Sequence, residues 1–276
     1  MRIDIVSLFP EFFDAFFSHS IIKRAIEAEC LSMGVTNPRD FSHNKHGQVD
    51  DTPYGGGAGM LMMAPPIFEA VESVIAQYDS HINNAYSVDE MCDEMSLIGN
   101  PSESLRRRVI FMGPTGQPFT QEKARELAMY DQLVLICGHY EGVDYRVEEH
   151  LVDETISIGD YVLTGGELPA MVVADAVARM IPGVLGAASG AQEDSFYEPL
   201  LECPQYTKPP EFRGWGVPDV LRSGHHKNIA TWRQKEALKR TRLLRPDLLE
   251  RPLTKEEVKL LKEIIAEESE RDKGEV

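Results

Sequence analysis

The 276-residue sequence is 42% hydrophobic and 26% charged, which suffices for the core of one large domain or two modest ones. Its four cysteines form no C-x-x-C pair, so neither a zinc site nor a disulfide framework is indicated, as expected for the reducing cytoplasm. The net charge of −17 argues against a nucleic-acid partner if taken alone, and charges interrupt every long apolar stretch, which excludes a membrane span.

Strand and helix patterns alternate over the first three-fifths of the chain, and this alternation predicts an α/β fold with a parallel sheet. Residues 132–138 form a nearly continuous apolar run, which is typical of a strand buried on both faces. The strands are expected at residues 2–9, 107–113, 132–138 and 155–163. The helices are expected at residues 11–30, 60–78 after a turn, 120–130 with Thr120 as its cap, 145–154, and from about Leu168 onward.

The remaining segments differ in composition. Residues 79–105 are predicted to be an acidic, polar insertion between a helix and a strand, with no recognisable chemistry. Residues 186–199 are small and polar, as is typical of a linker, and two helices are expected at about 226–245 and 254–270. We therefore expect an α/β domain over residues 1–185 and a small, mostly helical C-terminal domain over residues 200–276.

The positive charge is concentrated in the C-terminal part of the chain. Residues 206–245 contain ten basic and three acidic residues, a balance of +7, which leaves −24 for the rest of the chain. This asymmetry is typical of a region that binds a polyanion, although a solvated helix face gives the same pattern.

Glycine-rich segments are the clearest candidates for a binding site. The segment DTPYGGGAGM (51–60) has neither the Lys-Ser or Lys-Thr of a P-loop nor the third glycine of a dinucleotide-binding motif, so a flexible turn is the simpler interpretation. The segments GPTG (113–116), CGHYEG (137–142) and SIGDYVLTGG (157–166) fall at or near the ends of predicted strands. Ligands bind there in open α/β sheets, and glycine allows a flat ring to approach the backbone, so these loops predict a nucleotide-like ligand.

Several polar residues have a functional and a simpler interpretation. One acidic group could hold a hard metal but fits a solvated helix face better; it consists of Glu141, Asp144, Glu148, Glu149, Asp153 and Glu154. Asp175 and Arg179 are four residues apart, as in a local ion pair, and Asp194 has the position of a turn residue in the linker. We therefore assign no metal site.

The segments DTPYGGGAGM, FMGPTGQPF, CGHYEGVDYRVEEHLVDETISIGDYVLTGGELPAM and EDSF together resemble the bacterial tRNA (guanine-N1)-methyltransferase (TrmD) family of the SPOUT superfamily. The resemblance implies methyl transfer from S-adenosylmethionine to N1 of the guanosine at tRNA position 37, next to the anticodon. It also implies a deep trefoil knot in the sheet, a cytoplasmic homodimer with shared active sites, contact with the tRNA anticodon loop, and possible use of Mg²⁺.

By the same resemblance, three groups of residues surround the methyl donor. They are Phe111, Met112, Gly113 and Pro114; Gly138, Tyr140, Glu141 and Gly142; and Ser157, Ile158, Gly159, Asp160, Tyr161, Val162, Leu163, Gly165, Gly166 and Pro169. Phe111 and Gly113 stand where family members often have Tyr and Ser, so hydroxyl contacts are lost there.

The family's catalytic roles fall on two residues. Asp194 is expected to remove the proton from guanine N1, and Arg179 to stabilise the charge that develops on O6. Two alternatives remain open: another SPOUT methyltransferase that acts on ribose or on rRNA, and a non-catalytic, nucleotide-binding RNA chaperone.

Overall fold

The computed structural model describes residues 1–89, 105–186 and 190–274, and the chain divides into two compact units, Met1–Ala188 and Ser189–Val276. The boundary between the units falls inside the segment that was predicted to be a linker. No helix in these described ranges is both long enough and apolar enough to cross a lipid bilayer.

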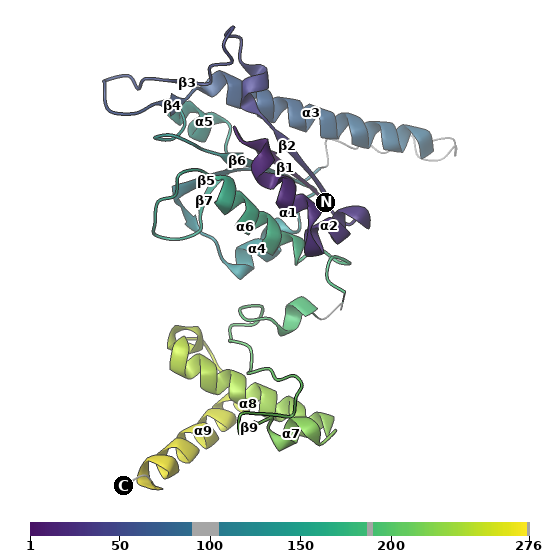
Figure 1. Ribbon diagram of the computed structural model, residues 1–276, viewed down its shortest axis with the longest axis vertical. Coiled ribbons are helices and arrows are strands. Elements are labelled where there is room, and N and C mark those ends of the chain that lie inside the picture. Colours follow the sequence, from purple (N-terminus) through teal and green to yellow (C-terminus); the bar gives the residue numbers. More distant parts are fainter. Residues whose placement is uncertain (90–104, 187–189, 275–276) are drawn as a thin grey trace. The chain divides into compact units, whose positions relative to one another are not determined.

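The first unit is built on a five-stranded, all-parallel sheet with the strand order β2-β1-β6-β5-β7, which confirms the predicted parallel α/β architecture (Figure 1). All six residues of β6 are buried, as its apolar run predicts. The strands are β1 (Arg2–Val6), β2 (Ser32–Thr36), β5 (Arg107–Pro118), β6 (Gln132–Cys137) and β7 (Glu154–Ser157), and a separate two-stranded ladder joins β3 (Asp50–Asp51) to β4 (Leu61–Met62).

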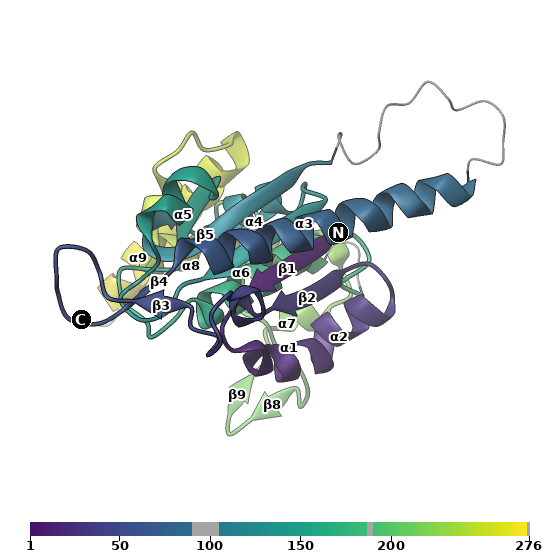
Figure 2. The same cartoon turned by 90° about the horizontal axis from the view of Figure 1, so that it is seen from above.

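Helices cover both faces of the sheet, and side chains that alternate along each strand supply two cores (Figure 2). On one face, Leu133 and Leu135 pack with α1 (Asp14–Ser18), α2 (Ser20–Glu27), α4 (Gln121–Leu127) and α6 (Glu167–Ala178). On the other face, Val134 and Ile136 pack with α3 (Ala64–Asp89) and α5 (Tyr145–His150). Alternation of this kind is what gives a central strand its unbroken apolar sequence.

The single helix expected over residues 11–30 is wrong, because the chain forms a 3-10 turn, η1 (Pro10–Phe13), followed by α1 and α2. The break lies at His19, whose backbone is extended, and at Ser20, which has a left-handed φ of 56°. The Ser18 hydroxyl donates to the Asp14 carbonyl at 2.6 Å. Side-chain hydrogen bonds of this kind compete with the helix ladder, and apolar spacing does not report them.

Further expectations differ from the structure. The strand predicted at 107–113 continues to Pro118, so residues 113–116, which were predicted to follow the strand, lie within β5, where its pairing with β7 shifts register. The strand predicted at 155–163 ends at Ser157, where the hydroxyl bonds both the N–H and the carbonyl of Gly159 and turns the chain into a loop. The edge strand β2 was not predicted. The predicted insertion at 79–105 begins as a continuation of α3, which runs to Asp89, while residues 90–104 lie outside the described residues.

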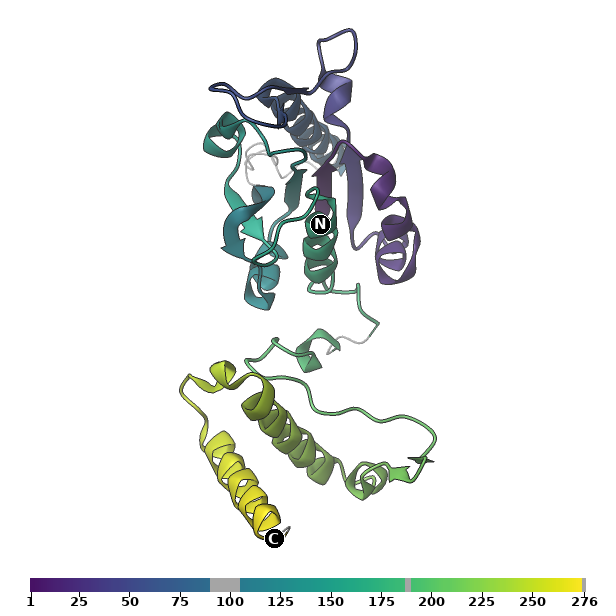
Figure 3. The same ribbon diagram turned by 60° about the vertical axis from the view of Figure 1, so that its left-hand side comes forward.

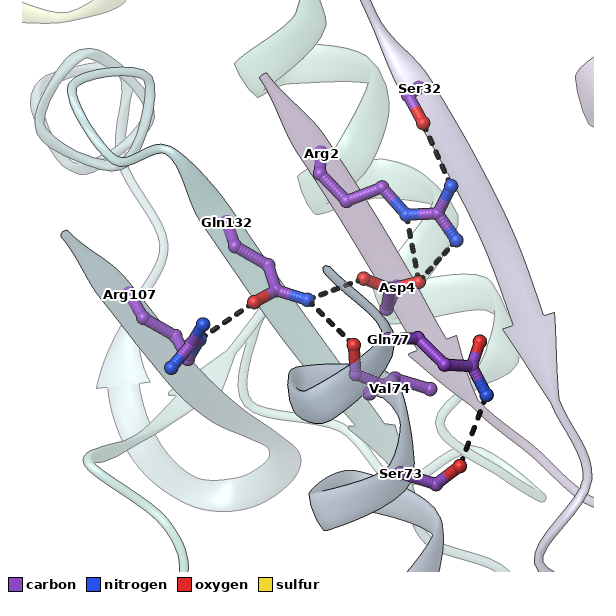
Figure 4. Close-up of polar contacts among 8 residues, drawn as sticks. All are labelled: Arg2, Asp4, Ser32, Ser73, Val74, Gln77, Arg107 and Gln132. Atoms are coloured by element: carbon purple, nitrogen blue, oxygen red, sulfur yellow. Dashed lines mark hydrogen bonds and ion pairs between the residues drawn. The ribbon is translucent and has the colours of Figure 1, made fainter. Parts of the chain in front are cut away.

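A polar network ties the amino-terminal ends of the central strands to α3 (Figure 4). Parallel register places Arg2 and Arg107 on either side of Gln132. Arg2 donates to Asp4 at 2.6 Å, and the buried Gln132 amide donates to Asp4 at 2.7 Å and to the Val74 carbonyl of α3 at 3.4 Å. Arg107 donates to the Gln132 oxygen at 2.6 Å. Every group in this buried row therefore has a partner, as buried polar groups require.

The second unit is mostly helical and has a small core of Leu238, Leu260 and Ile264. Helices α8 (His226–Leu244) and α9 (Lys255–Gly274) match the two helices expected here and pack against each other (Figure 3). The other elements are η4 (Gly190–Glu193), the hairpin strands β8 (Glu211–Phe212) and β9 (Trp215–Gly216), α7 (Asp219–Arg222) and η5 (Pro246–Leu249).

Candidate active site

A cavity of about 160 Å³ opens at the carboxyl ends of β5, β6 and β7 in the first unit. The three glycine-containing loops singled out in the sequence meet around it. Its lining contains every residue expected to surround a methyl donor except Asp160, and adds His139, Ile156 and Thr164. The structure thus brings these loops together, whereas their role in donor binding stays a prediction.

Bare backbone is needed where the third loop lies on the second. A Cβ atom at Gly166 would lie 2.6 Å from the Cα of Cys137 and 3.0 Å from the nitrogen of Gly138. The Gly166 N–H donates to the Gly138 carbonyl at 2.9 Å, and Gly165 forms a β-bridge with His139. Backbone atoms cannot move aside as the end of a side chain can, so only glycine fits at residue 166.

The buried ring of Phe111 separates the first and second loops. A Cβ atom would come within 2.8 Å of this ring at Gly113 and within 3.0 Å at Gly138. The two glycines therefore leave room for the ring between the two loops. The phenyl ring carries no polar atom, so it gives the cavity an apolar wall.

The glycine-dense segment 51–60 reaches the same site. The Glu141 N–H donates to the Met60 carbonyl at 3.1 Å, and the Met62 N–H donates to the Gly142 carbonyl at 2.9 Å. A Cβ atom at Gly59 would collide with the side chain of Glu141. The flexible-turn interpretation of this segment is therefore incomplete, because its C-terminal end supports the second loop.

Exposed apolar side chains border the cavity. Tyr161, Val162 and Leu163 are 55%, 85% and 38% exposed on the third loop, and Tyr140 is 42% exposed on the second, where it has a left-handed φ of 59°. Side chains of this kind are poorly placed in water and well placed against the flat face of a ligand. The cavity therefore fits a ligand with an apolar ring and with polar edges that face the backbone.

Two residues that sequence reasoning missed lie behind these loops. Glu167, at the start of α6, is 5% exposed and accepts a 2.8 Å hydrogen bond from Ser7 at the end of β1. The Nδ1 atom of His139 is buried and has no hydrogen-bond partner among the residues that the structure describes, and its ring packs edge-on against Phe9 and Tyr140. No spacing rule identifies such residues, because their contacts come from distant segments.

The two residues expected to perform the chemistry belong to different units. Arg179 caps the C-terminal end of α6 in the first unit, and its N–H donates to the Asp175 carbonyl at 3.1 Å. Asp194 follows η4 in the second unit, where it lines a cavity of about 530 Å³ together with Tyr206 and Trp232. Their cooperation therefore stays a prediction.

Three of the acidic residues around α5 have structural partners. Asp144 caps this helix and binds Arg146 at 2.6 Å, and the hydrogen bonds from Arg146 lower the pKa of the Asp144 carboxyl. Asp153 accepts from the Val109 N–H at 2.7 Å, and Glu154 pairs with Lys123 at 2.8 Å. Among the described residues, no three His, Cys, Asp or Glu side chains are grouped so that they could hold a metal ion.

The thiol of Cys137, at the end of β6, is close to the loops but is not a nucleophile. Its burial, with the nearby charge of Glu167, raises its pKa well above the ordinary value. A thiol is reactive only as the thiolate, so Cys137 stays protonated at neutral pH. What the cavity offers is positioning by backbone groups and apolar contact.

Comparisons with known proteins show the family to which the chain belongs. The model of the family described as tRNA (Guanine-1)-methyltransferase TrmD matches residues 1–251. Proteins named tRNA (guanine-N(1)-)-methyltransferase align over nearly the whole chain. One from Desulforamulus reducens is 55% identical and covers 96% of this chain and 95% of its own length. One from Dehalococcoides mccartyi strain CBDB1 is 51% identical and covers 98% of this chain and 99% of its own length. One from Brevibacillus brevis is 53% identical and covers 96% of this chain and 98% of its own length.

Proposed function

The chain belongs to the tRNA (guanine-1)-methyltransferase TrmD family, and from this premise we propose that it transfers a methyl group from S-adenosylmethionine to N1 of guanosine 37 in tRNA. The observation that carries the proposal is the convergence of loops 113–116, 137–142 and 157–166 on one cavity. Related enzymes that modify ribose or rRNA, and a non-catalytic RNA chaperone, are less well supported, because the named relatives share the full length of the chain.

The loops fit the donor. We expect the adenine ring to lie between apolar side chains such as Tyr161 and Leu163, with its edge toward the main chain of the loops that line the cavity. When bound, S-adenosylmethionine supplies a methyl group on a sulfonium, which leaves as a neutral thioether and needs no acid. The work of the protein is then to orient the donor and to prepare the guanine.

Guanine N1 carries a proton, so it has no free lone pair with which to attack a methyl group. We assign removal of this proton to Asp194. A free aspartate, with a pKa of about 3.9, is a weak base for this task, so the site must exclude water and place a cation near guanine O6. We assign the cation to Arg179.

Asp194 and Arg179 lie in separate units, and the family resemblance implies an active site shared between two copies of the chain. In a closed two-fold dimer, the linker of one protomer completes the donor site of its partner, and symmetry generates two identical sites. No step is assigned to Mg²⁺, because the described acidic side chains do not gather in a suitable group.

We also propose that the sheet contains the trefoil knot that the family resemblance implies. The chain leaves the edge strand β7, and its next segment bonds to the loop after β6, two strands further in. Between them, the pairing of β5 with β7 shifts its register from Met112 to Gln117, so that residues 113–116 bulge outward. A chain that passes beneath this bulge on its way to α6 would be knotted, an arrangement that general folding rules disfavour.

The basic segment 206–245 is proposed as the tRNA-binding surface. Four of its ten cations already bind carboxylates inside the second unit: Arg222, Lys235, Arg242 and Arg245. We assign the phosphate contacts to the exposed Lys208, Arg213, Lys227 and Arg240. Such contacts position the RNA without reading its sequence, so the choice of guanosine 37 depends on the site that receives the flipped base.

The test is transfer of a labelled methyl group to a tRNA transcript, followed by mass spectrometry that locates the methyl group. We expect N1-methylguanosine at position 37 and no product when adenosine replaces that guanosine. Asp194→Asn is expected to lower turnover by about 100-fold or more while leaving donor affinity unchanged. Glu250→Gln, an exposed carboxylate of the same unit outside the cavity that Asp194 lines, is the matched control. Methylation of a ribose would refute the reaction, and normal turnover by Asp194→Asn would refute the base.

A further inference from the structure

The hairpin of residues 210–217 in the second unit presents two aromatic side chains to solvent. Phe212 is 57% exposed and Trp215 is 69% exposed. The two residues pair across the hairpin, and the turn between them, Arg213–Gly214, has left-handed φ values of 55° and 84° at both positions. Turns with two such residues match the twist of the strands and hold a short hairpin in one shape.

The geometry of the pair leaves aromatic faces accessible. The ring centroids of Phe212 and Trp215 are 6.3 Å apart and the ring planes are inclined at 49°, so the rings do not stack on each other. The guanidinium of Arg213 lies 5.2 Å from the centroid of Phe212, within cation–π distance. The large apolar surface of Trp215 thus remains in water within its own unit, which is the usual mark of a surface that meets a partner.

The charge around the hairpin indicates the chemistry of that partner. Lys208 and Arg213 are exposed, Glu211 is the only acid among residues 208–217, and the hairpin lies within the +7 segment of a chain whose net charge is −17. Exposed aromatic rings interleaved with cations bind unpaired nucleotides, because the base stacks on the ring while the phosphate meets the cation. A base inside a duplex has no free face, so a double-stranded stem does not fit this surface.

We propose that the hairpin is a stacking platform for an unpaired nucleotide of the tRNA substrate, with the base on Trp215 and the flanking phosphates near Arg213 and Lys208. This rests on the proposed function only in taking tRNA as the substrate. The platform lies outside both catalytic assignments, and it contributes affinity and position. Stacking of one base on an aromatic side chain contributes about 1–3 kcal/mol, which corresponds to a change in affinity of about 5- to 150-fold.

Steady-state kinetics with full-length tRNA provide the first test. We expect Trp215→Ala to raise KM for tRNA by about tenfold with kcat unchanged, and Trp215→Phe, which keeps an aromatic face, to restore most of the affinity. Leu243→Ala removes a side chain that is 78% exposed on α8 of the same unit and is expected to leave KM unchanged. An unchanged KM in Trp215→Ala would overturn the proposal.

Fluorescence provides a test that does not depend on catalysis. The chain has two tryptophans, so Trp215 is the only one left in a Trp232→Phe variant. We expect an RNA hairpin with a seven-nucleotide loop to quench Trp215, and a blunt duplex of the same stem to leave it unchanged. A signal that follows protein concentration and ignores RNA would identify a second copy of the chain as the occupant and refute the platform.

The two proposals fail in different ways. If the wild-type chain methylates guanosine 37 while Trp215→Ala has an unchanged KM and no quenching is seen, the platform alone is wrong. If the wild type transfers no methyl group to guanosine 37, the proposed function is wrong, and quenching by the looped RNA still decides whether the hairpin binds unpaired nucleotides.

Discussion

The start of helix α9 depends on one buried carboxylate, that of Glu257, which is 6% exposed. Arg251 donates to both of its oxygens, at 2.6 and 3.2 Å, and the Thr254 N–H donates to it at 2.7 Å. The Glu257 N–H donates in turn to the Thr254 hydroxyl at 3.2 Å, which completes a capping box. The hydrogen bonds from Arg251 lower the pKa of Glu257 from 4.5 to about 2.

This pKa difference sets the expected effect of Glu257→Gln. Because the folded pKa is lower than the unfolded one, the stabilisation is fully present above pH 4.5 and is lost as the pH falls toward 2. At 1.36 kcal/mol per pKa unit, the ionised group contributes about 3 kcal/mol at pH 7 and about 1 kcal/mol at pH 3. We therefore expect the variant to be less stable by about 3 kcal/mol at pH 7, and the gap to narrow to about 1 kcal/mol at pH 3.

Urea unfolding followed by tryptophan fluorescence measures this effect, because Trp215 and Trp232 both lie in the second unit and report on it alone. The midpoint is expected to fall while the slope of the transition stays the same. Glu256→Gln changes the exposed neighbour of Glu257 on the same helical turn and is expected to leave the midpoint in place. Equal midpoints for Glu257→Gln and wild type at pH 7, or a gap that stays constant down to pH 3, would refute the reasoning.

Two further predictions concern the first unit. Gly166→Ala forces a methyl group onto the backbone of Cys137 and is expected to weaken donor binding at least about tenfold by calorimetry, whereas Gly186→Ala, with open space around its Cβ position, should bind normally. Gln132→Leu removes a buried amide that bonds Asp4, Arg107 and Val74, and is expected to lower the free energy of unfolding by about 2–4 kcal/mol. Gln77→Leu, at an exposed site on α3, is its control, and equal thermal midpoints for the two variants would contradict the assigned role of the network.

Sequence patterns predicted the strands and helices that depend on neighbouring residues alone. The buried strand β6 follows from its apolar run, and Thr120 caps α4 as expected by accepting from the Lys123 N–H at 3.2 Å. The edge strand β2 was missed because its sequence, SMGVT, is short and contains Gly34, and because only its pairing with β1 makes it a strand. Such pairing joins residues about thirty positions apart, and no window of neighbouring residues contains it.

The sequence predicted which loops form the candidate site, but not every residue that lies in it. Topology alone places loops 113–116, 137–142 and 157–166 at one edge of a parallel sheet, so their convergence could be expected from strand order. The positions of the buried Glu167 and His139 could not be expected, because their neighbours Ser7 and Phe9 are distant from them in the sequence. The assignment of Asp194 needed the family resemblance, because an acid in a linker has no distinguishing pattern.

The amino ends of the strands carry hydrogen-bonded side chains, whereas the carboxyl ends carry glycine-containing loops. This difference explains where a ligand can bind. At the amino ends, buried side chains such as Gln132 and Asp4 hydrogen-bond to one another and hold the strands together (Figure 4). At the carboxyl ends, Gly138 and Gly166 let the loops pack closely against one another around the cavity, so that main chain forms part of its wall. Substitutions at the amino ends should therefore reduce stability more than donor affinity. Substitutions at the carboxyl ends should reduce donor affinity more than stability. Thermal unfolding and donor titration of the same variants therefore distinguish the roles of the two ends.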